Sequence, residues 1–268
     1  MTTGLTDLDF LRTNQYKDSS NLSARAYLHQ RFSTNQVGWH FWVFNQFDFP
    51  QECKILELGC GPGNLWIENR NKIRVDWEIS LSDISEGMLQ EASNTLGSSG
   101  GFRYVGHDAC GIPFPTSVFD AVIANHMLYH LPDIPAALKE IRRVLKPGCC
   151  LYAATNGQAH LQEIRDWKSR FFPDQEDPAW GTPTLRFSMD NGEELLQQEF
   201  GNIHFIEYPD TLLVDRVEPI IRYIQSYTKL EETDPRTKRL RLFLQNRILE
   251  NGSIKITKES GLFRAAKY

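Results

Sequence analysis

A glycine-rich turn at residues 59–63 is the first part of the chain whose residue types and spacing favour ligand chemistry. Gly59, Gly61 and Gly63 follow a short apolar stretch at residues 55–58. Glycine adopts positive φ at little cost and lets bare N–H groups approach a ligand closely. A buried strand that enters such a turn and then a helix is how doubly wound folds begin a nucleotide site. No Lys-Ser/Thr pair follows this G-x-G-x-G turn, which excludes a Walker A phosphate loop.

Two acidic residues stand where the next two predicted strands end. Asp83 closes W-E-I-S-L-S-D, about 20 residues after Gly63, and Asp108 closes F-R-Y-V-G-H-D. An acid at the end of the second strand can accept hydrogen bonds from both hydroxyls of a ribose. The alternative for each acid is a structural role at a helix N-terminus. Asp83 or Ser85 could be the N-cap of the helix that follows the second strand, and Asp108 could cap another helix.

A second polar group follows the apolar run at residues 118–124, which is long enough for a strand covered on both faces. Asn125, His126, Tyr129 and His130 come directly after it, so we expect them at the carboxyl edge of the sheet, where open parallel sheets bind ligands. A histidine there can take a proton from a nucleophile, because its ordinary pKa is near neutral pH. The alternative is that one histidine is structural, and the choice between His126 and His130 stays open.

These motifs resemble those of class I S-adenosylmethionine-dependent methyltransferases. E-L-G-C-G-P-G at residues 57–63 is similar to the first motif of that family. H-M-L-Y-H-L-P-D resembles the type 11 subfamily, which includes enzymes of ubiquinone and menaquinone biosynthesis and many natural-product methyltransferases. I-P-F and R-V-L-K-P-G are also similar to family segments, and the resemblance covers about residues 50 to 155.

The resemblance implies S-adenosyl-L-methionine as the cofactor and assigns residues to its parts. Glu57 would order the glycine turn and the amino group, and Asp83 would bind the ribose. Asp108 would accept from the adenine amine, while the N–H of Ala109 would donate to a ring nitrogen. The predicted cofactor-binding set is Glu57, Gly59, Gly61, Gly63, Asp83, Ile84, Met88, Asp108, Ala109, Asn125 and Tyr16, and the candidate catalytic set is His126, His130 and Tyr129.

Around these residues we predict a single α/β domain. Its core is a Rossmann-like, seven-stranded, mostly parallel sheet with helices on both faces and a helical cap over the carboxyl ends of the strands. Residues 1–50 form an N-terminal helical cap, 51–156 the cofactor-binding core, and 157–268 the rest of the sheet with an inserted helical lid. We expect residues 254–268 to form one last strand that closes the sheet edge. Aromatic residues of the cap are expected to line the site, namely Tyr27, His29, Trp39, Trp167, Phe171, Phe172, Trp180, Tyr223 and Tyr227.

The composition of the chain limits the classes of partner that we expect it to bind. The net charge of −5 and pI of about 5.8 provide no basic footprint for nucleic acid. No apolar run approaches the length of about 20 residues that a membrane span requires, and the first residues lack the pattern of a secretory signal. The five cysteines have no C-x-x-C spacing, so we expect no metal site and no disulfide framework, and a cytoplasmic protein.

The expected function is methyl transfer to an N, O or C nucleophile of a small, aromatic or amine-bearing metabolite, with secondary metabolism favoured. An RNA or protein methyltransferase is one alternative, against which stand the acidic balance and N-H-M-L in place of an N-P-P-Y tetrapeptide. A nicotinamide-dependent oxidoreductase and a non-catalytic cofactor-binding protein are the others. The oligomeric state is left open.

Overall fold

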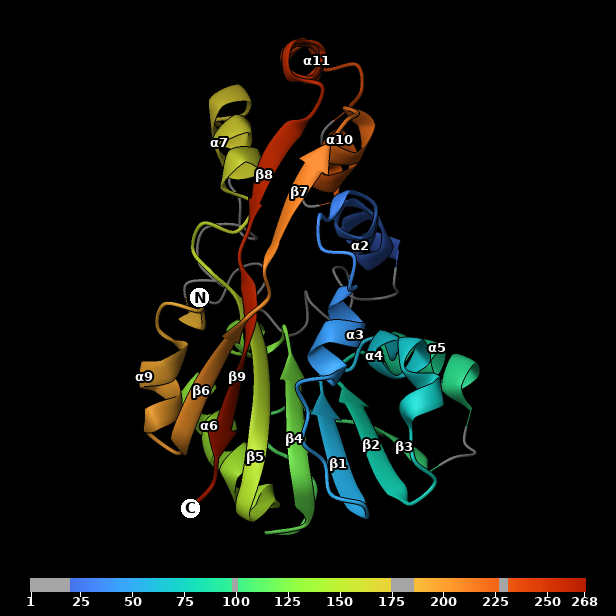
Figure 1. The fold of residues 1–268 in the computed structure, drawn as a ribbon, viewed down its shortest axis with the longest axis vertical. Helices are drawn as coiled ribbons and strands as arrows, with labels where there is room; N and C mark the ends of the chain where they lie inside the picture. Colours follow the sequence, from blue (N-terminus) through green and yellow to red (C-terminus); the bar gives the residue numbers. More distant parts are fainter. Residues whose placement is uncertain (1–19, 98–100, 175–185, 227–230) are drawn as a thin grey trace.

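The computed structural model describes residues 20–97, 101–174, 186–226 and 231–268, with the backbone alone for residues 20–25. Figure 1 shows a large sheet in the lower half of the molecule. A smaller two-stranded sheet rises above it and is surrounded by helices.

The large sheet has seven strands in the order β3-β2-β1-β4-β5-β9-β6. The first five are parallel, and β9 runs antiparallel to both β5 and β6. The predicted seven-stranded, mostly parallel sheet is therefore confirmed. Its strands are β1 (Cys53–Leu58), β2 (Trp77–Asp83), β3 (Phe102–Gly106), β4 (Phe119–Asn125), β5 (Leu145–Asn156), β6 (Gly201–Glu207) and β9 (Ser260–Ala266).

Helices cover both faces because the central strands are apolar on both sides. In β4, Val122 and Ala124 pack with α6 and α9, whereas Ala121 and Ile123 pack with α3, α4 and α5. This alternation follows the two-residue period of a strand. The elements on the two faces are α3 (Trp39–Phe44), α4 (Asn64–Glu68), the 3-10 turn Arg70–Lys72, α5 (Glu86–Leu96), the 3-10 turn Leu128–His130, α6 (Ile134–Val144) and α9 (Gly192–Gln197).

The cap stands over the carboxyl ends of the strands and has an apolar core of its own. Leu28, Ile164, Leu212, Ile220 and Ile256 are fully buried in it and come from five different elements. The cap helices are therefore held by their own packing as well as by the sheet. The elements are α2 (Ser20–Phe32), α7 (Gln162–Phe171), β7 (Asp210–Val214), α10 (Glu218–Gln225), α11 (Pro235–Asn251) and β8 (Ile254–Lys258).

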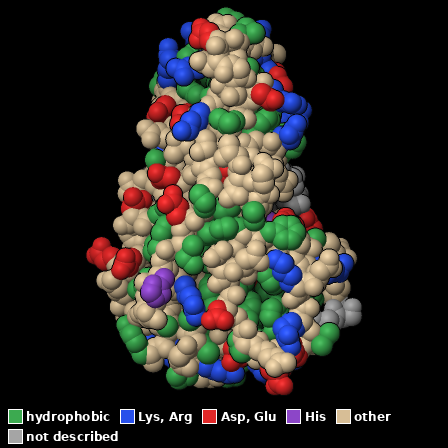
Figure 2. Space-filling model, in the orientation of Figure 1, with side chains coloured by type: hydrophobic (Ala, Val, Ile, Leu, Met, Phe, Trp, Pro, Cys, Tyr) green, Lys and Arg blue, Asp and Glu red, His purple; other side chains and the backbone are tan. Residues whose placement is uncertain are grey.

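The surface of the cap is charged, in contrast to its interior. On the face shown in Figure 2, Lys and Arg side chains lie along both edges of the upper part of the molecule, with Asp and Glu side chains among them. Charges of both signs are thus mixed on this face, and it carries no extended basic stripe of the kind that follows a nucleic-acid backbone.

The single last strand predicted for residues 254–268 is wrong. The segment divides at Glu259 into β8, which pairs with β7 in the cap, and β9, which enters the core sheet. β9 lies between β5 and β6, so the edge strand is β6. Residues 257–261, T-K-E-S-G, interrupt the apolar pattern there, and the two sets of pairing partners show that one strand ends and another begins.

Smaller boundaries also differ from the prediction. The third strand ends at Gly106, two residues before Asp108, and α6 ends at Val144 because residues 145–148 already belong to β5. The aromatic helix after Gly38 ends at Phe44, well before Pro50. Every helix within the described ranges is too short or too polar to cross a bilayer.

Candidate active site

A cavity of about 740 Å³ opens at the carboxyl ends of β1, β2, β4 and β5, beneath α2 and α3. It collects most of the residues that the motifs singled out. Of the predicted residues, those that line it are Glu57, Gly59, Gly61, Asp83, Ile84, Met88, Asp108, Ala109, Asn125, His126, Tyr129 and His130. Gly63 does not line the cavity, and Tyr16 lies outside the described residues.

The glycine turn needs glycine at each position for a different local reason. All three glycines have positive φ, at +62° for Gly59, +54° for Gly61 and +84° for Gly63. A Cβ on Gly59 would lie 2.8 Å from Cβ of Met127, and one on Gly63 would lie 2.9 Å from Cδ1 of Leu96. A Cβ on Gly61 would meet no atom within 4 Å, so the turn leaves open space above this residue. Gly63 thus serves helix packing, as the N-cap residue of α4, while Gly61 keeps the floor of the cavity clear.

Asp83 bridges the turn and the next helix. Its Oδ2 accepts from the N–H of Gly61 at 2.9 Å, and its Oδ1 accepts from the N–H of Ser85 at 2.8 Å. The N-cap of α5 is Ser85, whose hydroxyl accepts from the N–H of Met88. Asp83 is therefore not the cap, and its carboxylate keeps acceptor capacity for a ligand. Burial raises the pKa of this carboxyl, although the N–H donors of Ser85 and Gly61 oppose the rise.

Glu57 is almost fully enclosed at the base of the cavity. Its Oε2 accepts from the indole Nε1 of Trp66 at 2.6 Å. Burial raises its pKa to about 8, even though the indole donor favours the charged form. From the sequence alone, the aliphatic residues Leu65 and Ile67 are the ones expected to be buried in α4, the helix that follows the glycine turn. The structure instead buries Leu65 and Trp66, because Trp66 is the residue that reaches the carboxylate.

Asp108 and Asn125 complete this side of the cavity. The Oδ1 of Asp108 accepts from the N–H of Cys110 at 2.9 Å, which fixes the loop after β3. Oδ1 of Asn125 is buried at the end of β4 and has no hydrogen-bond partner among the described residues. Buried acceptors of this kind are almost always paired in folded proteins, so a donor from a ligand fits here.

His126 occupies a strained and enclosed position. Its φ is +55°, which is uncommon for a residue with a side chain. Burial, helped by the nearby positive groups His40, Lys258 and His130, lowers its pKa to about 3. Its ring centroid lies 4.8 Å from that of Trp39 and 6.5 Å from that of Tyr129. In this state His126 is a neutral hydrogen-bonding group and a weak base.

The cap supplies the other wall. His29 and Trp39 line the cavity, as does Tyr223, whereas Tyr27 is 45% exposed and does not. Trp167, Phe171 and Phe172 pack in or against the apolar core of the cap instead. Trp180 and Tyr227 lie outside the described residues.

His160, Tyr208 and Lys258 also line the cavity wall, although the sequence did not single them out. The rings of His29 and His160 stack with centroids 5.6 Å apart, and Nζ of Lys258 lies 2.5 Å from Oδ2 of Asp210. Lys258 and Tyr208 line the cavity. They come from the part of the chain where β7 and β8 rise above the carboxyl ends of the core strands (Figure 1). Neither strand's contribution could be recognised without the pairing of β7 with β8.

The arrangement of hydrogen-bond acceptors fits S-adenosylmethionine. Acidic side chains at the ends of β1, β2 and after β3 suit its amino group, ribose hydroxyls and adenine amine. The open space at Gly61 and the unpartnered acceptor of Asn125 agree with a polar ligand along this edge.

Residues 56–153 match the family model described as a methyltransferase domain, Methyltransf_11. The segment from β1 to β5 is therefore similar to a methyltransferase domain. The match begins in β1 and ends in β5, so the methyltransferase domain includes the glycine turn, Asp83, Asp108 and the histidines after β4.

Known proteins resemble the chain beyond the family model. Demethylmenaquinone methyltransferase of Staphylococcus aureus is 29% identical over 134 residues, which is 50% of this chain and 56% of that protein. The chain thus matches about half the length of such curated relatives.

Solved structures share the fold. Phosphoethanolamine N-methyltransferase 2 of Haemonchus contortus, in complex with S-adenosyl-L-methionine, has a TM-score of 0.60 at 18% identity, covering 99% of this chain and 60% of that one. A SAM-dependent methyltransferase of Aquifex aeolicus has a TM-score of 0.52 at 14% identity, covering 99% of this chain and all of that one.

Proposed function

We propose that the chain transfers a methyl group from S-adenosylmethionine to an N, O or C nucleophile of a small metabolite. One observation carries the proposal. A single cavity joins the glycine turn, Asp83 and Asp108 to a second space beneath the cap, lined by Trp39, Tyr208 and Tyr223 among others. A cavity of about 740 Å³ falls in the range that takes small molecules.

The sulfonium of the cofactor supplies an already activated methyl group. The protein then has to align the acceptor and exclude water. Asp83, Asp108 and Glu57 would hold the cofactor, with the N–H of Gly61 and the loop after β3 kept in place by the carboxylates they contact. His126 would hold the acceptor through a hydrogen bond, since its lowered pKa makes it a weak proton acceptor. An amine of low pKa would react without a base, whereas a phenol would lose its proton to His130, Tyr129 or solvent.

The wall of aromatic residues supports an aromatic or amine-bearing acceptor, and we place the reaction in secondary metabolism. All five cysteines are free thiols in the structure, which supports a reducing, cytoplasmic setting. The predicted division at residues 50 and 156 remains part of this proposal, with residues 51–156 as the cofactor-binding unit.

The test is calorimetric titration with S-adenosylmethionine and S-adenosylhomocysteine on wild type and on Asp83→Ala. We expect binding that weakens about 100-fold in the variant, because a charged acceptor at the heart of the site is lost. Asp76→Ala is the matched control, since Asp76 stands just before the other end of β2 and pairs only with Arg74 at the surface. No binding to wild type would sink the proposal, and a nicotinamide dinucleotide would then be titrated instead.

A further inference from the structure

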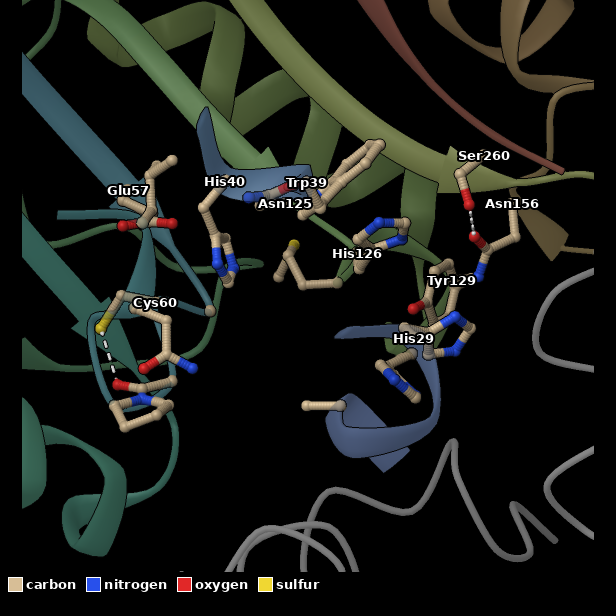
Figure 3. A pocket seen from close by; sticks show the side chains of 18 of the residues that line it. His29, Trp39, His40, Glu57, Cys60, Asn125, His126, Tyr129, Asn156 and Ser260 are labelled. Atoms are coloured by element: carbon tan, nitrogen blue, oxygen red, sulfur yellow. Dashed lines mark hydrogen bonds between the residues drawn. The ribbon is translucent and has the colours of Figure 1, made fainter. Parts of the chain in front are cut away.

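The cavity has two ends of different charge. Every carboxylate that lines it within the described ranges comes from the first half of the chain, and these are Glu57, Glu68, Asp83 and Asp108. Figure 3 shows Glu57 and Cys60 on one side of the cavity, and His126, Tyr129 and His29 on the other. Trp39, His40 and Asn125 lie between the two groups. We call these the cofactor end and the cap end.

The cap end collects positive and imidazole groups and lacks carboxylates among its described lining residues. Arg31, Arg165 and Lys258 line it together with three imidazoles, His29, His126 and His160. Lys258 is already neutralised by Asp210. A cationic amine would thus find no counter-charge at this end. This argues against an acceptor whose amine is protonated, among the amine-bearing acceptors that the sequence allowed.

Arg165 is the charged group best placed to meet a ligand. Its Nη1 and Nη2 donate to the carbonyl oxygens of His160 and Gln158, and it forms no ion pair with a carboxylate in the described part of the chain. A guanidinium has five N–H donors, and carbonyl oxygens do not cancel its charge. The half-buried side chain therefore keeps both charge and donors at the cavity wall.

Two imidazoles that line the same cavity have a buried ring nitrogen without a hydrogen-bond partner among the described residues. Nδ1 of His126 and Nδ1 of His160 make no hydrogen bond with the described residues. Burial, with His40 and Lys258 nearby, lowers the pKa of His126, and burial, with His29 and Lys258 nearby, lowers that of His160, so each ring is neutral and has a single N–H donor. The ring of His160 already bonds to the backbone of Glu259, whereas His126 can present its N–H at the unpartnered Nδ1. An anion would accept from the N–H of His126 and from the guanidinium of Arg165, and would relieve the excess of positive groups.

We propose that the methyl acceptor carries a carboxylate or phosphate group that binds at the cap end, to Arg165 and the imidazole of His126. This inference rests on the proposed methyl transfer. Anchoring the anion at the cap end leaves the opposite part of the acceptor, with its nucleophile, directed toward the cofactor end. The acceptor is thus a small aromatic hydroxy or amino compound with one acidic substituent.

The experiment uses the full chain saturated with S-adenosylhomocysteine, whose own titration is done first. Failure of that first titration would sink the methyltransferase proposal alone. Four matched probes follow by calorimetry: 3-hydroxybenzoate, 3-hydroxyphenyl phosphate, 3-hydroxybenzyl alcohol and 3-hydroxybenzylamine. We expect at least one anion to bind about tenfold tighter than the alcohol, and the amine to bind weakest. Tightest binding of the amine, or no anion tighter than the alcohol, would overturn the inference, and the two anions distinguish carboxylate from phosphate.

Variants of Arg165 separate ligand binding from loop support. Arg165→Gln should remove the anion's advantage, while Arg165→Lys, which keeps the charge but not the fork of donors, should retain part of it. Arg170→Gln is the matched control, because Arg170 lies on the same helix, stacks on Phe171 and Phe243, and does not line the cavity. If Lys and Gln at position 165 weaken all four probes equally, Arg165 only supports the loop and the inference is wrong.

Discussion

The cofactor end and the cap end of the cavity are built in opposite ways. At the cofactor end, Glu57, Asp83 and Asp108 lie at or within two residues of a strand end and accept from nearby N–H groups, as Asp83 does from Gly61 and Ser85. At the cap end, the wall is assembled from residues as distant as His29, His160 and Lys258. Local motifs thus shape one end, whereas tertiary packing shapes the other.

The clearest example of tertiary packing at the cap end is the buried cluster around Asp210. Its carboxylate accepts from the hydroxyl of Ser33, the N–H of Asn35 at 3.0 Å and the ammonium of Lys258 at 2.5 Å. The side chains of Asp210 and Lys258 are 0% and 6% exposed. This cluster ties the end of α2 to both strands of the small sheet, and so it holds the cap over the site.

Breaking that pair should produce the largest effect. Lys258→Met leaves the carboxylate of Asp210 buried without its ammonium partner, and we expect the free energy of unfolding to fall by about 3 kcal/mol. Urea denaturation measures this change. Adding Asp210→Asn should recover part of the loss, because the uncompensated charge is then removed.

The same variant tests the independence of the two ends. Lys258→Met should change the affinity for S-adenosylhomocysteine by less than about twofold, since independent, distant sites are nearly additive. Arg216→Met is the control, because its pair with Asp215 is at the surface and its loss should not measurably change stability. A collapse of cofactor affinity in Lys258→Met would show that the two ends fold as one unit.

A pair of glycine substitutions probes the cofactor end. Gly59→Ala brings a Cβ to 2.8 Å from Met127, so we expect a loss of about 2 kcal/mol in the free energy of unfolding. Gly61→Ala has the same positive φ and no neighbour within 4 Å, so its loss should be smaller, while cofactor binding should suffer more. Thermal unfolding and cofactor titration, run on both variants, should therefore rank them in opposite orders. Equal ranking by both measurements would mean that Gly61 does not face the ligand.

The same contrast explains what could be predicted from sequence. The order of strands and the cofactor end follow from contiguous motifs, in which a strand, a glycine turn and an acid at a set spacing act together. β7 was not predicted, and the polar run T-K-E-S-G at residues 257–261 does not by itself distinguish a bend within one strand from a boundary between two. Lys258 and His160 could not be recognised either, since isolated residues acquire meaning only when distant strands bring them to one wall.

The burial of Trp66 was missed for a different reason. Leu65 and Ile67, the aliphatic residues of this helix, were the ones expected to be buried, but the buried carboxylate of Glu57 needs a donor, and the indole N–H of Trp66 provides it. A polar requirement thus decided which face of α4 is buried. Periodicity counts apolar residues and does not register such a requirement.

The remaining contrast is a pH dependence of the free energy of unfolding that differs in sign between the two ends. At the cofactor end, burial raises the pKa of Glu57 from 4.5 to about 8, so the folded protein keeps a proton that the unfolded chain releases. The free energy of unfolding should then fall as pH rises from about 5 to 8, by up to about 1 kcal/mol per pH unit. At the cap end, burial opposes ionisation of Asp210, but Lys258 and Ser33 outweigh it and lower its pKa, so that contribution is lost as pH falls.

Glu57→Gln isolates the first of these contributions. The amide oxygen can still accept from Trp66, and no proton is exchanged, so the slope between pH 5 and 8 should flatten while the acid limb from Asp210 persists. Urea denaturation at several pH values measures both, with the exposed Glu78→Gln as control. An unchanged slope would mean that Glu57 is ionised in the folded protein. Its carboxylate would then meet the cofactor's ammonium group already charged, and cofactor binding would release no proton from this residue.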